Sequence, residues 1–131
     1  MGAAENKAAV AAAYEAFGQG DVASVIAMNA PDATWVNYST DASPLQGEFK
    51  GLDAIGAFFG VVGDSIEISE FDIAPIAAEG DIVVSHGHQT YTVKKTGKTV
   101  SGPVLHIFTF GPDGKVTRFE EWEHGTESAW A

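Results

Sequence analysis

Histidines and glutamates recur at alternating positions in the second half of the chain, and these residue types are the ones most often used for proton transfer. His106 stands between Val104 and Phe108 in a run where every second side chain falls on the same face of a strand. Burial among such neighbours would lower the pKa of the imidazole and keep it neutral near pH 7. His106 could then act as a base or a hydrogen-bond donor, although a histidine on an apolar face is also common as a core residue.

An acidic cluster closes the run 116–124. Strand alternation places Glu121 and Glu123 on one face, opposite Glu120, Trp122 and His124. A glutamate held in an apolar cavity would have a raised pKa and could serve as a general base. The alternative is a solvated strand end with no chemical role.

His86 and His88 form an H-x-H pair that points the same way as Thr90. Two metal ligands can use this spacing, and His106 on a neighbouring strand would supply a third. We expect instead that no metal or other cofactor is bound and that one histidine of the pair, His88, helps to line a cavity.

Apolar residues at helical spacing predict three helices in the first half of the chain. The first contains Val10, Tyr14 and Phe17 and ends at a glycine, at position 18 or 20. Asp21 caps a short second helix that ends near residue 29, and a third helix begins at Leu52 after a loop rich in Ser, Asp, Pro and Gly.

Strands follow a period of two. A strand over 33–38 puts Trp35 and Asn37 on one face, and four long strands are predicted at 66–78, 82–94, 98–110 and 116–124. Short turns between the last four make them antiparallel hairpins. This order predicts an α+β fold in which a cone-shaped, curved antiparallel sheet packs against three N-terminal helices around a cavity. Pro75 and the break at 101–103 are expected sites of bulging or bending.

Composition narrows the function classes. The 131 residues, 45% of them hydrophobic, fit one domain, and the net charge of -11 makes nucleic acid an improbable partner. The chain has no cysteine, which excludes thiol chemistry and is compatible with a reducing cytoplasm. No membrane-spanning run or secretory signal is visible, so we expect a cytoplasmic protein with no membrane partner.

Four segments carry a family resemblance. They are the helix from Tyr14 to Phe17 with its Gly20-Asp21 end, and the runs 31–35, 51–55 and 113–119. In this order and over residues 1–131, the chain resembles the nuclear transport factor 2-like superfamily, which has a cystatin-like fold, and within it the SnoaL-like and ketosteroid-isomerase-related branch. The resemblance implies a single SnoaL-like domain that forms a homodimer through the outer face of its sheet.

The resemblance also places functional positions. Asn37 stands where steroid isomerases of the superfamily have their aspartate base, and an amide cannot shuttle a proton. His106 stands where they have a protonated aspartic acid, and Tyr14 is one position from their oxyanion tyrosine. His124 occupies the place of an aspartate in SnoaL-like cyclases, and Arg118, the only arginine, belongs to the turn and strand rather than to a hydrolase site.

The sequence therefore predicts a protein that binds a small, largely apolar molecule in the cone, as an isomerase, cyclase or hydrolase that uses proton transfer. The alternative is a non-catalytic binding or interaction module, favoured by the loss of aspartate at Asn37, and Asn37→Asp would separate the two. The predicted catalytic residues are His106, Asn37 and Glu121. The predicted pocket lining comprises Tyr14, Trp35, Phe58, Phe59, His88, Val104, Phe108 and Trp122.

Overall fold

Three helices form where the apolar spacing predicts them, in a computed structural model that describes residues 2–124 and 126–131. They are α1 (Ala3–Gly18), α2 (Val22–Ala27) and α3 (Leu52–Ser65). The carboxylate of Asp21 accepts a hydrogen bond from the backbone N–H of Ser24, which confirms Asp21 as the cap of α2. Gly20 adopts a positive φ of 79°, which lets the chain turn sharply from α1 into α2.

Six strands make one sheet, in the order β2-β1-β6-β5-β4-β3. The bounds are β1 (Asn29–Tyr38), β2 (Gly47–Lys50), β3 (Ile66–Glu79), β4 (Ile82–Val93), β5 (Thr99–Phe110) and β6 (Val116–Glu123). The hairpins from β3 to β6 are antiparallel as predicted, but β1 pairs parallel with β6, so the sheet is mixed rather than wholly antiparallel.

Two short elements escaped prediction. The loop after β1 contains β2, which pairs with β1 as an edge strand, and the chain ends in a helix, α4 (Glu127–Trp130). Both have only four residues, too few to display a hydrophobic period.

Curvature arises at irregularities of the ladder. The pairing of β3 with β4 shifts between Pro75 and Ala77, which confirms the bulge predicted at Pro75. No bulge forms at 101–103, because β4 and β5 keep one register through those residues. Gly87 allows β3 to approach closely, since a Cβ there would lie 1.9 Å from the carbonyl oxygen of Asp72.

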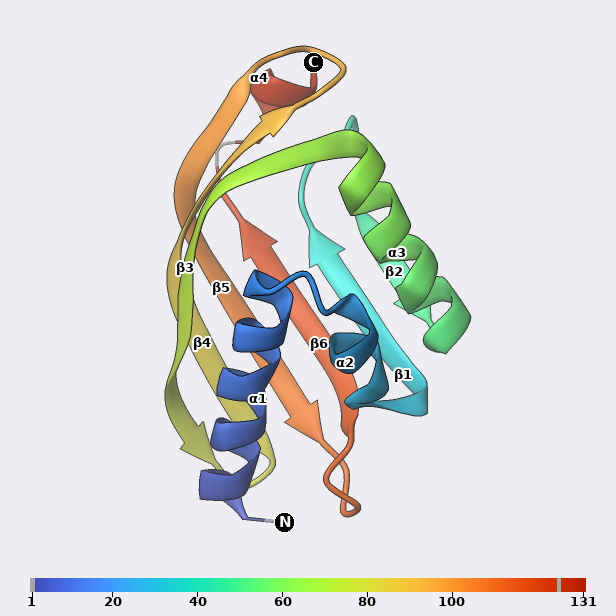
Figure 1. Cartoon of the computed structure of the whole chain (residues 1–131), viewed down its shortest axis with the longest axis vertical. Coiled ribbons are helices and arrows are strands. Elements are labelled where there is room, and N and C mark those ends of the chain that lie inside the picture. Colours follow the sequence, from blue (N-terminus) through green and yellow to red (C-terminus); the bar gives the residue numbers. More distant parts are fainter. Residues whose placement is uncertain (1, 125) are drawn as a thin grey trace.

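The three N-terminal helices lie on one side of the curved sheet (Figure 1), which confirms the α+β arrangement. The sheet therefore has an inner face, covered by α1, α2 and α3, and an outer face without a helical cover. Within the described residues, no helix is long and apolar enough to cross a membrane.

Candidate active site

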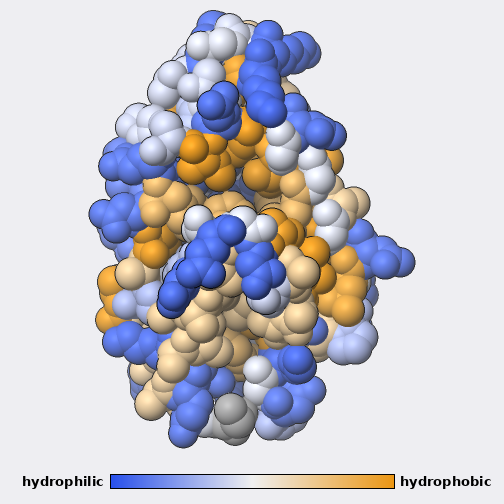
Figure 2. Space-filling view, in the orientation of Figure 1, coloured by the Kyte–Doolittle hydropathy of each residue, from blue (hydrophilic) through white to orange (hydrophobic). Residues whose placement is uncertain are grey.

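A cavity lies between the helices and the inner face of the sheet. Its volume is about 90 Å³, several times the roughly 10–15 Å³ that a single water needs, so a small organic group can enter. The surface is hollowed beside the end of α1, with hydrophobic residues around the hollow (Figure 2). Most of the lining is apolar, with residues such as Phe17, Met28, Trp35, Phe58, Phe59, Val62, Ile68, Phe71 and Phe108.

A row of polar side chains crosses the inner face at right angles to the strands. Ser85 of β4 pairs with His106 of β5, His106 pairs with Glu121 of β6, and Glu121 pairs with Asn37 of β1. Directly paired residues put their side chains on the same face, so the four groups lie side by side across four strands. The ladder brings together residues up to 84 positions apart in the sequence.

His106 is held at both ring nitrogens. Its Nε2 lies 2.6 Å from Oε1 of Glu121, and its Nδ1 lies 2.7 Å from the hydroxyl of Tyr14 on α1. An ionised carboxylate only accepts, so Nε2 donates to Glu121, and a neutral imidazole then accepts the Tyr14 hydrogen at Nδ1. Burial raises the pKa of Tyr14, which keeps its hydroxyl protonated.

Aromatic rings fix the plane of this imidazole. The ring of His106 lies edge-on to Phe119, at a centroid distance of 4.9 Å, and to Phe108, at 6.2 Å. The residue is 3% exposed. Because both nitrogens are hydrogen-bonded and two aromatic rings pack against the imidazole, His106 has one orientation, as a group that must transfer or donate protons requires.

Glu123, two residues beyond Glu121, also faces the cavity. Burial and the nearby charge of Glu121 raise the pKa of Glu123 to about 7. Its Oε1 accepts hydrogen bonds from the hydroxyl of Tyr91 at 2.8 Å and from Nε2 of Gln89 at 3.0 Å. A carboxyl group with a pKa near neutrality can both take up and release a proton at physiological pH.

Several buried polar atoms at this site have no hydrogen-bond partner among residues 2–124 and 126–131. They are both amide atoms of Asn37, Oγ of Ser85 and Oε2 of Glu123. Buried polar groups are normally paired, so this is the part of the inner face with hydrogen-bonding capacity left over. These atoms offer one donor in the Asn37 amide, acceptors in the same amide and in an ionised Glu123, and a hydroxyl that does either.

Most of the predicted lining lies where the sequence placed it. Tyr14, Trp35, Phe58, Phe59 and Phe108 line the cavity, together with the predicted catalytic residues His106 and Glu121. Asn37 and Val104 are buried on the inner face without belonging to the lining.

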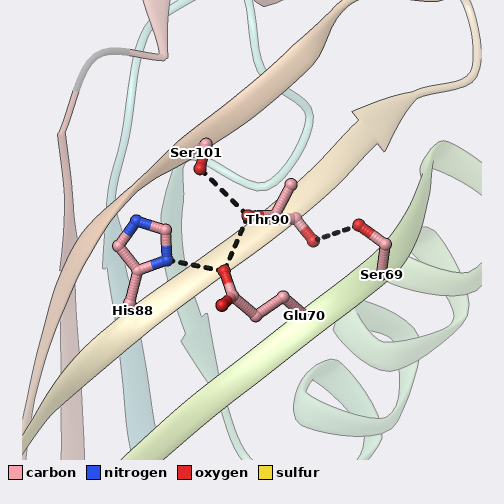
Figure 3. A network of polar contacts seen from close by, with 5 residues as sticks. All are labelled: Ser69, Glu70, His88, Thr90 and Ser101. Carbon is pink, nitrogen blue, oxygen red and sulfur yellow. Dashed lines mark hydrogen bonds and ion pairs between the residues drawn. The ribbon is translucent and has the colours of Figure 1, made fainter.

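Two predicted lining residues lie on the wrong face. Trp122 stacks on Tyr38 of the outer face, with ring centroids 4.9 Å apart. His88 belongs to an exposed polar network with Glu70, Thr90 and Ser101 (Figure 3). Side chains alternate along a strand, so Trp122 faces away from Glu121, and His88 faces the same side as His86. Which of the two sides faces the cavity therefore decides whether each residue lines it.

A three-histidine metal site is ruled out by this geometry. His86 and His88 lie on the outer face, whereas His106 is buried on the inner face. In the described part of the chain, no group of three or more His, Cys, Asp or Glu side chains converges on a point that could hold a metal ion.

Sequence reasoning missed Glu123, Gln89 and Ser85 as members of the site. Parity had already put Glu123 on the same face as Glu121, and the same rule applied to β4 places Ser85 and Gln89 together. What the pattern lacked was a reason to bury a second glutamate, which only the three-dimensional position of Tyr91 and Gln89 supplies.

The fold and site define a small cone-shaped α+β protein with a buried polar row at the base of an apolar cavity. A family model for the SnoaL-like domain matches residues 10–119. The chain therefore belongs to the SnoaL-like family, within the nuclear transport factor 2-like superfamily. The match stops before Glu121 and Glu123, so both inward-facing glutamates lie beyond the matched segment.

Solved structures agree on the fold. An NTF2-like protein from Burkholderia xenovorans is 30% identical, over 92% of this chain and 90% of that one, with a TM-score of 0.79. TerC, co-crystallised with polyporic acid, is 28% identical over 88% of each chain, with a TM-score of 0.71. A candidate SnoaL-like polyketide cyclase from Mesorhizobium loti is 21% identical over 94% of this chain and 100% of that one, with a TM-score of 0.77, and it shows the fold alone. A search of curated proteins gave no match.

Proposed function

We propose that this protein binds a small, largely apolar carbonyl compound in the cone and catalyses a proton transfer on it. The observation that carries the proposal is Glu123, a carboxyl group in an apolar cavity with a pKa of about 7 and one oxygen, Oε2, unpaired within the described residues. A base of this kind is matched to proton abstraction near neutral pH. The co-crystallisation of TerC, a protein 28% identical to this chain, with polyporic acid supports a role for the cavity in binding organic molecules.

The step begins with the Oε2 lone pair of ionised Glu123. Oε2 takes a proton from the carbon next to the carbonyl, the C–H electron pair becomes the C=C bond of an enolate, and negative charge develops on the carbonyl oxygen. The Tyr14 hydroxyl would stabilise that charge by turning its hydrogen from Nδ1 of His106 to the carbonyl oxygen. Returning the proton at another carbon gives isomerisation, and attack of the enolate on a second carbonyl gives cyclisation.

Asn37 does not act as a base in this scheme. Its amide is buried, and both its polar atoms lack partners in residues 2–124 and 126–131. Because Asn37 does not line the cavity, its place in the scheme is behind Glu121, its partner in the pairing of β1 with β6.

The test uses 3-cyclohexen-1-one, a small enone whose conversion to 2-cyclohexen-1-one requires the same proton transfer. The wild-type rate should exceed the buffer rate and rise with pH to a plateau above about pH 7, because Glu123 must be ionised to act as a base. Glu123→Gln should lower the rate by about 10²–10⁴-fold. Glu120→Gln, a neighbouring carboxylate of β6 on the outer face, is the matched control and should leave the rate unchanged.

A non-catalytic binding module is the second candidate, favoured by the amide at Asn37. Binding of the enone without any difference in rate between wild type and Glu123→Gln would overturn the enzymatic proposal and favour this one. An activity that appears only in Asn37→Asp would show that the cone can support the reaction and that the natural chain does not carry it out.

We also propose that the protein forms a homodimer through the outer face and works in the cytoplasm. The stacked Tyr38 and Trp122 and the neighbouring Leu105 form an apolar strip across β1, β6 and β5 that a second copy would cover. Light scattering that gives the mass of one chain would overturn the dimer. Fractionation of the native host tests the location.

A further inference from the structure

The C-terminal helix α4 packs at the end of the sheet where β4 turns into β5 (Figure 1). The hydroxyl of Thr96 donates to the carbonyl of Ala129 at 2.6 Å, and Nζ of Lys98 donates to the carbonyl of Ser128 at 3.2 Å. These bonds hold Trp130 with its ring centroid 6.4 Å from that of Tyr91. Trp130 is 6% exposed, so the chain returns to the inner face after β6 has ended.

A directional hydrogen-bond chain runs from this helix to the site. Nε1 of Trp130 lies 3.4 Å from the hydroxyl oxygen of Tyr91, which lies 2.8 Å from Oε1 of Glu123. An indole N–H can only donate, so the Tyr91 oxygen accepts from Trp130 and its own hydrogen is directed to Glu123. Burial and the charge of Glu123 raise the pKa of Tyr91, which keeps that hydrogen in place.

The two oxygens of Glu123 are thereby made unequal. Oε1 accepts from both Tyr91 and Gln89, whereas Oε2 is buried without a partner among the described residues. A carboxyl group held by two donors on one oxygen keeps one rotamer and presents the other oxygen. Hydrogen bonds in such a chain also polarise and strengthen each other.

We propose that Trp130 is a positioning residue that acts through Tyr91 to fix Glu123, so that Oε2 is the oxygen that exchanges the proton. This inference rests on the proposed function. It adds to the site a residue that lies outside the segment matched by the family, residues 10–119. The competing explanation is that Trp130 only fills space beneath α4.

The first test follows the indole N–H resonances of the three tryptophans by ¹H–¹⁵N NMR in the unmodified protein. The Trp130 resonance should shift with pH in step with the titration of Glu123 near pH 7, and the shift should vanish in Glu123→Gln. Trp35, which donates to Asn29, and Trp122 on the outer face serve as internal controls. A Trp130 resonance that ignores this titration, or one that still follows it in Glu123→Gln, overturns the inference.

The second test is a double-mutant cycle read as the pKa of Glu123 by carboxyl ¹³C NMR. Tyr91→Phe removes a donor to the carboxylate and should raise that pKa by about one unit, a tenfold change in proton affinity. Trp130→Phe should raise it by less, because Tyr91 becomes a weaker donor. In the Tyr91→Phe background, Trp130→Phe should add nothing, since its effect passes through the missing hydroxyl.

Equal shifts from Trp130→Phe in both backgrounds would mean that Trp130 only packs, and the inference would fail. Trp122→Phe makes the same chemical change on the outer face and should leave the titration of Glu123 unchanged. If Trp130→Phe leaves the pH profile of enone isomerisation unaltered while Glu123→Gln abolishes the activity, the inference falls and the proposed function stands. If the cycle behaves as expected while Glu123→Gln isomerises as fast as wild type, the proposed function falls and the hydrogen-bond chain stands.

Discussion

Each face of the sheet carries a histidine bonded to a glutamate. On the inner face, Nε2 of His106 lies 2.6 Å from Oε1 of Glu121, and the two side chains are 4% and 16% exposed. On the outer face, Nδ1 of His88 lies 2.6 Å from Oε1 of Glu70, and the side chains are 47% and 50% exposed (Figure 3). The two pairs share residue types and distance, so any difference in their behaviour comes from their surroundings.

The two pairs differ in their exposure to water, and this exposure sets how strongly each histidine interacts with its glutamate. Solvent screens the outer pair and can replace either partner, whereas the inner pair has given up its hydration and depends on its own hydrogen bonds. A buried pair is therefore costly to break and able to act on a ligand, because a low local dielectric strengthens its field. The same chemistry is a surface feature on one face and a candidate catalytic group on the other.

The two pairs should differ most in the stability that is lost when each histidine is removed. His106→Ala leaves Glu121 buried without its partner and should lower the free energy of unfolding by about 3–5 kcal/mol. His88→Ala leaves Glu70 in water and should change it little. Urea denaturation of both variants measures the difference, and similar losses for the two would show that burial does not separate the pairs.

The carboxylates of the two faces should also give pH dependences of opposite sign. Burial and the charge of Glu121 raise the pKa of Glu123 from 4.5 to about 7, so the folded protein binds the proton more tightly than the unfolded chain does. The free energy of unfolding should therefore fall, by on the order of a few kcal/mol, as pH rises from about 4.5 to about 7. Glu123→Gln should remove this part of the dependence.

On the outer face, hydrogen bonds from Thr90 and His88 lower the pKa of Glu70. Its contribution is present above its unfolded pKa and is lost as pH falls through the lowered value. The free energies of unfolding of Glu123→Gln and Glu70→Gln, each subtracted from wild type, should change with pH in opposite directions, for Glu123 between about pH 4.5 and 7 and for Glu70 below about pH 4.5. Parallel slopes would contradict the assignment of Glu123 as a buried acid.

Removing the hydroxyl group that bonds to each pair should give a smaller difference in stability between the two faces. Tyr14→Phe removes the partner of Nδ1 of His106, 2.7 Å away, and should cost about 1–3 kcal/mol of stability. Thr90→Val removes a hydroxyl that donates to Glu70 at 2.8 Å, where water can take its place, and should cost less. Thermal unfolding compares them, and a larger loss for Thr90→Val would reverse the expected order.

The sequence predicts the long elements well because each repeats its hydrophobic period several times. The strand patterns at 66–78 and 82–94 correspond to β3 and β4 almost residue for residue, whereas β2 and α4 are too short to show a period. Pairing is harder to predict, since the parallel contact of β1 with β6 joins residues about 80 positions apart.

At the site, alternation predicted which residues share a face but not which face is covered. The prediction for Glu121, which lines the cavity, is confirmed. The predictions that His88 and Trp122 line the cavity are wrong, because both lie on the outer face of the sheet. The choice between faces depends on where the helices dock, which a strand's own pattern leaves open when both faces carry aromatic and charged residues. Trp130 was out of reach for a similar reason, because its contact with Tyr91 depends on how the chain turns after β6.

The smallest expected difference between the two pairs is in how their coupling energies respond to salt. Raising the ionic strength from about 0.1 M to about 1 M shortens the screening length from roughly 10 Å to 3 Å, which weakens charges in water far more than charges inside the protein. The coupling energy between His88 and Glu70, measured by a double-mutant cycle, should shrink toward zero. The coupling between His106 and Glu121 should persist, because the counterions that screen the outer pair cannot reach a bond whose partners are 4% and 16% exposed. Equal salt sensitivity of the two couplings would mean that solvent reaches the inner row, and the cavity could not then hold Glu123 as a near-neutral base.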